Sequence, residues 1–435
     1  MMGKLGHWLT PWEKEKVCEA LLRYNLLKWD NARRLPLKSG GETDIYINLR
    51  NARSTPEALM FLTQTFTNPI MRLLPDRFVE VPDSVSCFAG PLAIMTDVPY
   101  ITIREEEKTG RATKAKTIGD YHYGERVTII DDVITDGASK VVPFRECVAM
   151  GLNVLPLIVL VDRQQGWQKK FQEENIPLDV WPGMTLHDVR RYLIENKLMR
   201  RCDPAVEEKN PLIVALDGKD WDDILPLLDV LRTTGCILKV NDLLLAEGIN
   251  NLIPELQVYG RVMADLKGHD IKNTLENIAK RIRPHEPWVV TVHGSGGKEM
   301  VQATVKALEG TRTKVLVVTV LTSINQATCE EIYTRLPIDE VRVLARIAHE
   351  AGAQGIVCSP EEVGELRQKY PDMMLVTPGV RSPGKEAGDQ KRIGTPAAAF
   401  EAGANHLVIG RQILGAFDPV AEVFRVLREE LKIAI

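Results

Sequence analysis

Eight short apolar runs recur in the second half of the chain, and stretches with helical spacing separate them. Short apolar runs bounded by polar residues or glycine are typical of buried strands. Eight strands that alternate with helices predict an α/β fold closed into a TIM (β/α)8 barrel, whose chemistry lies at the carboxyl ends of the strands. The runs are Leu212–Asp217, Cys236–Val240, Arg261–Lys267, Trp288–Gly294, Lys314–Leu321, Gly355–Ser359, Leu375–Gly379 and Leu407–Gly410.

The third of these runs ends in a cluster of charges. Val262–Ala264 lead into Asp265 and Lys267, and Asp270 follows shortly afterwards. Residues two apart in a strand share a face, so Asp265 and Lys267 should lie side by side, with Asp270 beyond the strand in a loop. Burying such charges often costs more than their attraction returns, which favours a chemical role. The alternative is an exposed strand end with an ordinary salt bridge.

Size and composition bound the remaining possibilities. A chain of 435 residues predicts two domains, and the charged, proline-containing segment Lys197–Asn210 is the expected linker between domains 1–204 and 205–435. The net charge of −4 means that the chain has no overall excess of positive charge to attract nucleic acid. We find no signal peptide and no apolar run long enough to span a membrane. The seven cysteines lack metal-ligand spacing, so we expect a cytoplasmic protein with reduced thiols and no structural zinc.

The first half contains a helix-spaced segment, Pro11–Trp29, and a later strand that ends in paired carboxylates. Val127–Ile130 precede Asp131 and Asp132, and Thr135–Ser139 then open a helix. Backbone N–H groups at such a helix N-terminus form a cup for a phosphate. Adjacent carboxylates suit ribose hydroxyls and the surroundings of a Mg²⁺ ion. The order of these features therefore predicts a site for a ribose 5-phosphate.

This segment resembles the phosphoribosyl-diphosphate signature of type I phosphoribosyltransferases, and four neighbouring motifs resemble orotate phosphoribosyltransferase. These are LKSG at 37–40, YINLR at 46–50, LVDRQQG at 160–166 and MTLHDVRRYL at 184–193. The resemblance implies a parallel-sheet domain that uses Mg²⁺ bound with phosphoribosyl diphosphate. It implies these roles: Asp131 and Asp132 for the ribose hydroxyls, with Asp132 also catalytic; Thr135, Asp136, Gly137, Ala138 and Ser139 for the 5-phosphate; Lys38 and Arg163 for orotate; and Arg104 with the catalytic Lys108 on a basic lid.

The second half resembles orotidine 5'-phosphate decarboxylase through six motifs in family order. They include ALD at 215–217, ADLKGHDIKNT at 264–274, TVHGSGG at 291–297 and VIGR at 408–411. The resemblance implies a cofactor-free reaction within a homodimer that shares its active sites. It implies that Lys267, Asp265, Asp270 and Lys239 are catalytic, and that Asp217, Thr274, Ser323, Pro378, Gln390, Gly410 and Arg411 bind the substrate, with Asp270 and Thr274 supplied by the partner subunit.

Together the two resemblances are those of bifunctional UMP synthases, which convert orotate to orotidine 5'-phosphate and then to UMP. Two alternatives remain open. Glu105, where the family usually has lysine, and the shortened Phe88–Ile94 turn allow a non-catalytic nucleotide-binding or dimerising N-terminal module. The Asp-x-Lys-x-x-Asp layout also occurs in metal-dependent sugar-phosphate lyases such as hexulose-phosphate synthase. His293 at a strand end fits a structural role as well as a catalytic one.

Overall fold

The computed structural model describes residues 6–31, 35–36, 42–82, 84–103, 117–384 and 392–435. The chain divides into two compact units, Met1–Arg200 and Arg201–Ile435, whereas the boundary predicted from the linker lies at 204/205. All seven cysteines are free thiols. Among the described residues, no helix combines the length and the apolar character needed to cross a bilayer.

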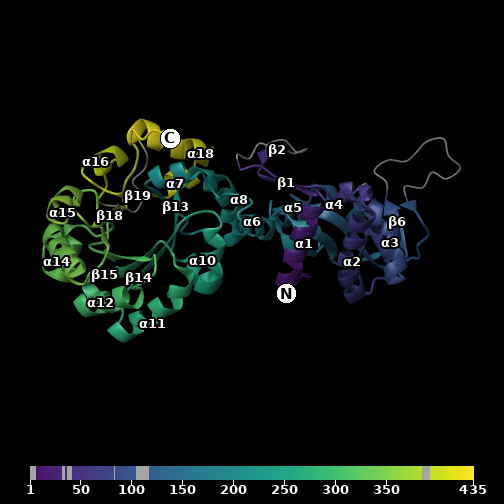
Figure 1. Cartoon of the computed structure of the whole chain (residues 1–435), viewed down its shortest axis with the longest axis horizontal. Coiled ribbons are helices and arrows are strands. Elements are labelled where there is room, and N and C mark those ends of the chain that lie inside the picture. The colour runs from purple at the N-terminus through teal and green to yellow at the C-terminus, as the bar shows by residue number, and fades with distance from the viewer. Residues whose placement is uncertain (1–5, 32–34, 37–41, 83, 104–116, 385–391) are drawn as a thin grey trace. The chain divides into compact units, whose positions relative to one another are not determined.

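The N-terminal unit is built on a seven-stranded sheet (Figure 1). Its strands follow the spatial order β11-β10-β8-β5-β6-β7, with β9 also beside β8, and all neighbours are parallel except β6 and β7. The strand bounds are β5 Arg77–Glu80, β6 Tyr100–Ile103, β7 Thr117–Ile118, β8 Arg126–Ile134, β9 Asn153–Val154, β10 Leu157–Asp162 and β11 Val180–Thr185. Two short antiparallel pairs accompany it, β1 Leu27–Trp29 with β4 Ile45–Ile47 and β2 Leu35–Pro36 with β3 Glu42–Thr43.

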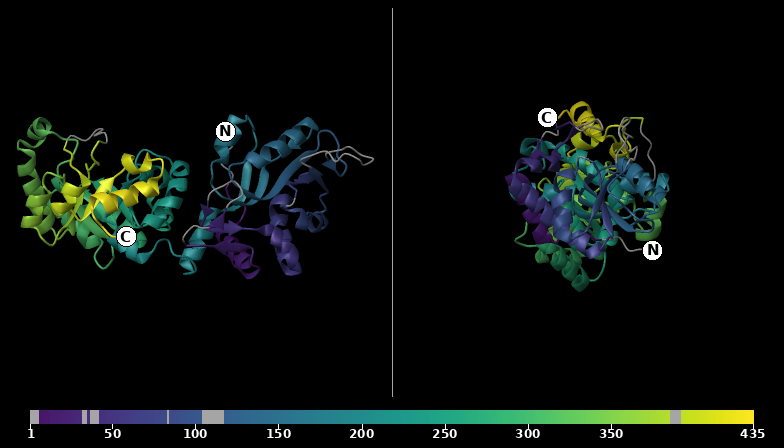
Figure 2. Two further views of the ribbon diagram at one scale, coloured as in Figure 1. Left: turned by 90° about the horizontal axis from the view of Figure 1, so that it is seen from above. Right: turned by 90° about the vertical axis from the view of Figure 1, so that its right-hand side faces the viewer.

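Helices cover both faces of this sheet, as the left view of Figure 2 shows. Successive strand residues point to opposite faces, so Ile130 belongs to one apolar core and its neighbour Ile129 to the other. The first core packs under α1 Pro11–Arg23, α2 Pro56–Leu73, α3 Ser86–Thr96 and α6 Leu186–Glu195, and the second under α4 Ala138–Ala149 and α5 Trp167–Glu173. A 3-10 helix, Leu49–Ser54, leads into α2.

Two predicted boundaries in this unit are wrong. The opening helix ends at Arg23 rather than Trp29, because Asn25 adopts a left-handed φ of 55° and Leu27–Trp29 pair with the strand Ile45–Ile47. The strand expected to end at Ile130 continues to Ile134, since Asp131 and Val133 still pair with β10. The paired carboxylates therefore lie within a strand, not after it.

The C-terminal unit is a closed barrel of eight parallel strands, which confirms the predicted TIM barrel (Figure 1). Each strand overlaps one of the eight apolar runs, with ends that differ by up to three residues. Seven buried residues, one from each of seven strands, fill the interior: Ile213, Ile237, Met263, Val289, Leu316, Val376 and Val408. The strands are β12 Leu212–Ala215, β13 Ile237–Val240, β14 Val262–Gly268, β15 Val289–His293, β16 Lys314–Val318, β17 Gly355–Val357, β18 Met374–Thr377 and β19 His406–Ile409.

Helices form the outer layer of the barrel and connect its strands. The longest is α14, whose buried positions Val341, Leu344, Ala345 and Ala348 recur at helical spacing. The helices are α7 Pro204–Lys209, α8 Trp221–Leu231, α9 Leu243–Glu247, α10 Ile249–Gln257, α11 Lys272–Ile282, α12 Lys298–Ala307, α13 Gln326–Tyr333, α14 Pro337–Glu350, α15 Val363–Lys369, α16 Pro396–Glu401, α17 Arg411–Leu414 and α18 Pro419–Arg425, with 3-10 turns at Arg232–Thr234, Arg283–His285 and Gly294–Gly296 and a π-helical turn at Val426–Glu430.

Candidate functional site

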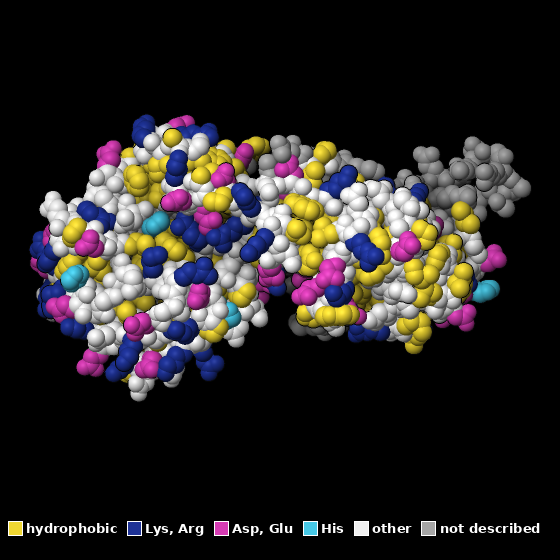
Figure 3. All heavy atoms as spheres, viewed as in Figure 1, with side chains coloured by type: hydrophobic (Ala, Val, Ile, Leu, Met, Phe, Trp, Pro, Cys, Tyr) yellow, Lys and Arg dark blue, Asp and Glu magenta, His cyan; other side chains and the backbone are white. Residues whose placement is uncertain are grey.

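A cavity of about 520 Å³ opens at the carboxyl ends of the barrel strands. On the face of the barrel unit turned to the viewer in Figure 3, Lys and Arg side chains gather beside Asp and Glu. Eight of the residues predicted for this unit line the cavity, although they are spread over almost 200 positions of sequence. They are Asp217, Lys239, Asp265, Lys267, Ser323, Pro378, Gly410 and Arg411.

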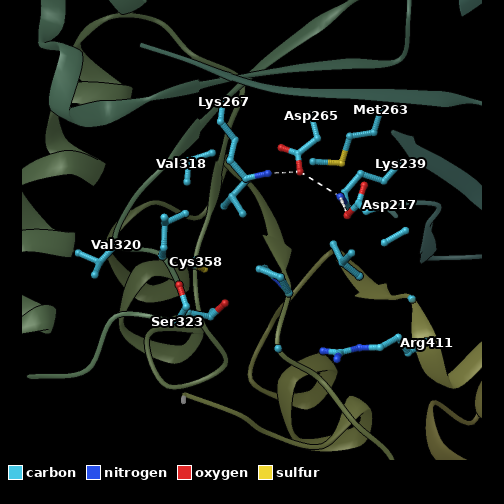
Figure 4. A pocket seen from close by; sticks show the side chains of 18 of the residues that line it. Asp217, Lys239, Met263, Asp265, Lys267, Val318, Val320, Ser323, Cys358 and Arg411 are labelled. Carbon is cyan, nitrogen blue, oxygen red and sulfur yellow. Dashed lines mark hydrogen bonds and ion pairs between the residues drawn. The ribbon is translucent and has the colours of Figure 1, made fainter. Parts of the chain in front are cut away.

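Four of these side chains form a continuous row of alternating charge along one wall (Figure 4). Nζ of Lys267 lies 2.6 Å from Oδ2 of Asp265, and Nζ of Lys239 lies 3.2 Å from the same oxygen. Lys239 also donates to Oδ2 of Asp217 at 2.5 Å. The strands β12, β13 and β14 are neighbours in the barrel, which brings these residues together. We call Asp217, Lys239, Asp265 and Lys267 the charged row.

The two inner members of the charged row are buried, and each keeps the other ionised. Burial opposes the charge of Asp265, but Lys239 and Lys267 together outweigh it and lower the pKa of this carboxyl. Burial likewise opposes the charge of Lys239, yet Asp265 and Asp217 raise its pKa. At neutral pH the row therefore holds a carboxylate and an ammonium side by side away from water.

The strand that carries Asp265 and Lys267 is less regular than predicted. The two residues do lie side by side, but the pairing of β14 with β15 shifts in register between Ala264 and Gly268. Lys267 has a φ of 47°, in the left-handed region that non-glycine residues rarely adopt. The expectation of an ordinary strand face was therefore wrong in geometry, although the neighbours it predicted are correct.

The opposite part of the cavity carries polar and cationic groups from later strands. Ser323 follows β16, and Arg411 begins the helix after β19. Figure 4 shows both side chains on the side of the cavity away from Asp265 and Lys239. Arg381 also lines the cavity, and sequence reasoning missed it even though it stands within the motif TPGVRSPG. A second unpredicted lining residue is Cys358, whose thiol is buried at the end of β17. Arg381 and Arg411 both line the cavity, and arginine side chains are common ligands of phosphate and carboxylate groups.

Of the three remaining predicted residues, the two that the structure describes lie elsewhere. Asp270 is exposed in the loop after β14, where its carboxylate accepts the N–H of Ile271, and Thr274 is in the first turns of α11. Neither residue lines the cavity formed by the described part of this chain. Gln390 lies outside the described residues. His293 is absent from the lining residues too; burial, His269 and Lys267 lower its pKa.

The paired carboxylates of the N-terminal unit, Asp131 and Asp132, lie within the last part of β8. Asp131 is buried and forms an ion pair with Lys140, from the first turn of α4, so its carboxylate points to a side chain of the chain itself. Burial, followed by the charge of Asp131, raises the pKa of Asp132 from its usual 3.8 to about 7. The sequence motif includes Lys140, but its position nine residues after Asp131 did not reveal the pair.

The predicted phosphate loop, Thr135–Ser139, does lead into the N-terminus of a 12-residue helix. Gly137 has a φ of 80°, and a Cβ there would lie 2.8 Å from Phe171, so only glycine fits. The carboxylate of Asp136 already accepts the N–H of Ala138 at 3.1 Å. Arg163 is buried, with its guanidinium donating to Oγ1 of Thr43 at 3.0 Å. Lys38, Arg104 and Lys108 lie outside the described residues.

A closed parallel barrel with charged side chains converging on the carboxyl ends of its strands defines the C-terminal unit as a (β/α)8-barrel enzyme. Residues 210–426 match the profile of the "Orotidine 5'-phosphate decarboxylase / HUMPS family". The chain belongs to this family.

The relatives of the chain carry the name of the decarboxylase. This chain is 40% identical over 212 residues to an orotidine 5'-phosphate decarboxylase of Sphingopyxis alaskensis, and the match covers 48% of this chain and 94% of that protein. It is 41% identical over 224 residues to one from Halorhodospira halophila, covering 50% and 94%. A crystal structure of the Lactobacillus acidophilus decarboxylase, 34% identical, covers 51% of this chain and 98% of its own with a TM-score of 0.44. Each match spans about half of the chain.

Proposed function

We propose that the barrel decarboxylates orotidine 5'-phosphate to UMP and CO₂ in pyrimidine biosynthesis. Loss of CO₂ from C6 of the pyrimidine develops a carbanion with little resonance relief. The site must therefore supply fixed positive charge and a proton where that carbanion forms. The ammonium of Lys267 can supply both, because it lies at the cavity end of the charged row.

The observation that carries this proposal is that the charged row and two arginines, Arg381 and Arg411, line one cavity. Arg411, Arg381 and the backbone of Gly410 would hold the 5-phosphate away from the reacting carbon, and Ser323 would contact the edge of the base. Asp217 would contact ribose hydroxyls. Binding energy from the phosphate could then be used to hold the base against Lys267.

A metal-dependent sugar-phosphate lyase is the rival within the same family. Oδ2 of Asp265 receives the ammonium groups of both Lys239 and Lys267 within 3.2 Å, so it already has two cationic partners. This arrangement favours the decarboxylase. The test is CO₂ release from orotidine 5'-phosphate by the full chain in the presence of EDTA. Full activity supports the proposal, whereas activity only on a hexulose phosphate, and only with Mg²⁺, supports the lyase.

We further propose that the N-terminal unit makes the substrate of the barrel, from orotate and phosphoribosyl diphosphate. The parallel sheet, the two carboxylates within the last part of β8 and the loop at the N-terminus of α4 support a site for a ribose 5-phosphate. Arg163 belongs to the loop after the neighbouring strand β10, which suits contact with the carboxylate of orotate. The two proposed reactions are consecutive, because the N-terminal unit would form the orotidine 5'-phosphate that the barrel consumes.

The residues of this unit fit a Mg²⁺ ion that arrives with the diphosphate. Among the residues that the structure describes, no group of three His, Cys, Asp or Glu side chains could cage a metal by itself. Mg²⁺ commonly keeps several waters and binds through substrate phosphates and one or two carboxylates. Asp132 could provide one of these, whereas the carboxylate of Asp131 is already paired with Lys140. When bound, the ion would neutralise charge on the diphosphate leaving group.

An assay of orotate consumption with phosphoribosyl diphosphate and Mg²⁺ tests this step. Formation of orotidine 5'-phosphate that EDTA abolishes, while CO₂ release from added orotidine 5'-phosphate persists, supports two different sites. Binding of phosphoribosyl diphosphate without turnover would instead support the non-catalytic module.

We also propose a homodimer in which Asp270 completes the barrel site of the other subunit. Asp270 is exposed and does not line the cavity of its own described chain. Mixing inactive Lys267→Ala and Asp270→Ala chains should restore activity, since one site of each mixed dimer would then have both residues. No recovery after subunit exchange would contradict shared sites.

A further inference from the structure

We propose that Thr291 is the positioning residue of the charged row: its hydroxyl fixes both the backbone of Lys267 and the carboxylate of Asp265. The inference rests on the proposed decarboxylase function for its kinetic consequences, but its geometry is independent of it. Thr291 lies in the middle of β15, is fully buried and does not line the cavity.

The register of β14 and β15 places Thr291 opposite a bulge in β14. Ala264 pairs with Val290 and Gly268 pairs with Val292. Between these pairs β14 has three residues, 265 to 267, whereas β15 has only Thr291. A bulge of this kind leaves backbone groups without their regular ladder partners. The one side chain opposite the bulge is therefore placed to replace them.

The hydroxyl of Thr291 both accepts and donates a hydrogen bond at the bulge. It accepts the backbone N–H of Lys267 at 2.9 Å and donates to Oδ1 of Asp265 at 2.8 Å. A hydroxyl has a single proton, so donation to Asp265 orients it and leaves a lone pair for Lys267. The result is a directed relay from the Lys267 N–H through Thr291 to the Asp265 carboxylate.

Through this relay, the two oxygens of the Asp265 carboxylate have different partners. Oδ1 is held by Thr291, and Oδ2 is left for the ammonium groups of Lys239 and Lys267. The same hydroxyl also holds the Lys267 backbone, whose φ of 47° is unfavourable for lysine. Without it, both the lysine and the carboxylate beside it would lose a fixed orientation.

Two substitutions separate the hydroxyl from the rest of the side chain. Thr291→Val keeps the shape but removes the relay, whereas Thr291→Ser keeps the relay and removes a methyl group. Thr304→Val is a matched control, since Thr304 is equally buried in α12 but donates only to the Met300 carbonyl at 3.1 Å. All three variants are made in the full chain, and urea unfolding reports their folding.

We expect Thr291→Val to lower kcat for orotidine 5'-phosphate by about 10- to 100-fold, the usual value of a hydrogen bond to a charged group. KM should change little, because Thr291 does not line the cavity. Thr291→Ser should restore most of kcat. The acid limb of kcat/KM should move to higher pH in Thr291→Val, since Asp265 loses a donor while Lys239, Lys267, Asp217 and His293 remain around it.

Amide hydrogen exchange at Lys267 provides a readout that needs no turnover. The amide should exchange faster in Thr291→Val and normally in Thr291→Ser and Thr304→Val. The inference is overturned if Thr291→Val retains kcat and its pH profile, or if the Ser and Val variants are impaired equally, which would mean that packing alone matters. If wild-type protein releases no CO₂ from orotidine 5'-phosphate, the proposed function fails, and unchanged exchange at Lys267 in Thr291→Val would separately refute the relay.

Discussion

Replacement of Lys239 by methionine should be the most informative change in the barrel, because Lys239 holds two carboxylates and is itself buried. Its ammonium lies 3.2 Å from Oδ2 of Asp265 and 2.5 Å from Oδ2 of Asp217. Methionine fills a similar volume without the charge, so the change tests electrostatics more than packing.

The expected size follows from Coulomb's law. At an effective dielectric constant of about 20, two unit charges at that 3.2 Å separation attract by about 5 kcal/mol. Water that enters the site screens part of this loss, and Lys267 still pairs with Asp265. Because about 1.4 kcal/mol corresponds to one pKa unit, we expect the acid limb of kcat/KM to rise by at least about one pH unit.

The same loss should appear in the pH dependence of folding. In the wild-type chain the pKa of Asp265 is lowered, so the folded state binds fewer protons than the unfolded state near pH 4. This contribution to stability is present above the unfolded pKa of about 3.9 and disappears as the pH falls through the folded value. In Lys239→Met the contribution shrinks, and acid unfolding should begin at a higher pH.

The assay is the pH profile of decarboxylation, followed by the loss of substrate absorbance. Lys280→Met is the matched control, since Lys280 pairs with Glu276 at 2.6 Å on the exposed face of α11. That variant should match the wild type in both measurements. An acid limb that does not move in Lys239→Met, with kcat unchanged, would refute the view that this ammonium keeps Asp265 ionised.

Three further predictions concern single residues. Lys267→Ala should abolish CO₂ release but leave formation of orotidine 5'-phosphate intact, which carboxyl-labelled orotate can follow; loss of both would contradict two sites. Burial and Asp131 raise the pKa of Asp132 to about 7, so the free energy of unfolding should fall as the pH rises from about 4 to 7. Asp132→Asn should therefore resist urea better than the wild type at pH 8 but not below pH 4. Arg190→Met should destabilise the N-terminal unit by about 3–5 kcal/mol in urea unfolding. Arg190 pairs with the buried carboxylate of Asp44 at 3.0 Å, and the substitution removes this partner. An unchanged urea midpoint would contradict this prediction.

The barrel could be predicted from the sequence because each of its strands is a local signal. An apolar run such as Lys314–Leu321 is recognisable without knowledge of its neighbours, and the eight-fold alternation then leaves few topologies. The ends of elements were harder. The apolar spacing of Pro11–Trp29 continues past Arg23, and only pairing with Ile45–Ile47 turns its last residues into a strand.

Parts of the candidate site depend on contacts between distant residues, and the sequence carries no signal for these. Lys267 and Asp265 are two residues apart, so their contact could be predicted from strand periodicity. Thr291 reaches the same carboxylate only because β14 bulges against β15, a feature of pairing rather than of local pattern. The ion pair of Lys140 with Asp131 could not be predicted either, since it depends on the turn between β8 and α4.

The arrangement of the charged row gives a physical reason for a second lysine, Lys239, beside the lysine that we propose as the proton donor, Lys267. The outer members are the more exposed, with 44% of the Asp217 side chain and 34% of the Lys267 side chain accessible, against 8% and 7% for Lys239 and Asp265. When Lys267 gives up its proton, Asp265 loses one of its two cationic partners. Lys239 remains, and its raised pKa ensures that it stays charged. Asp265 therefore stays paired throughout the proposed reaction, so the row can release a proton at its open end without leaving an isolated buried charge.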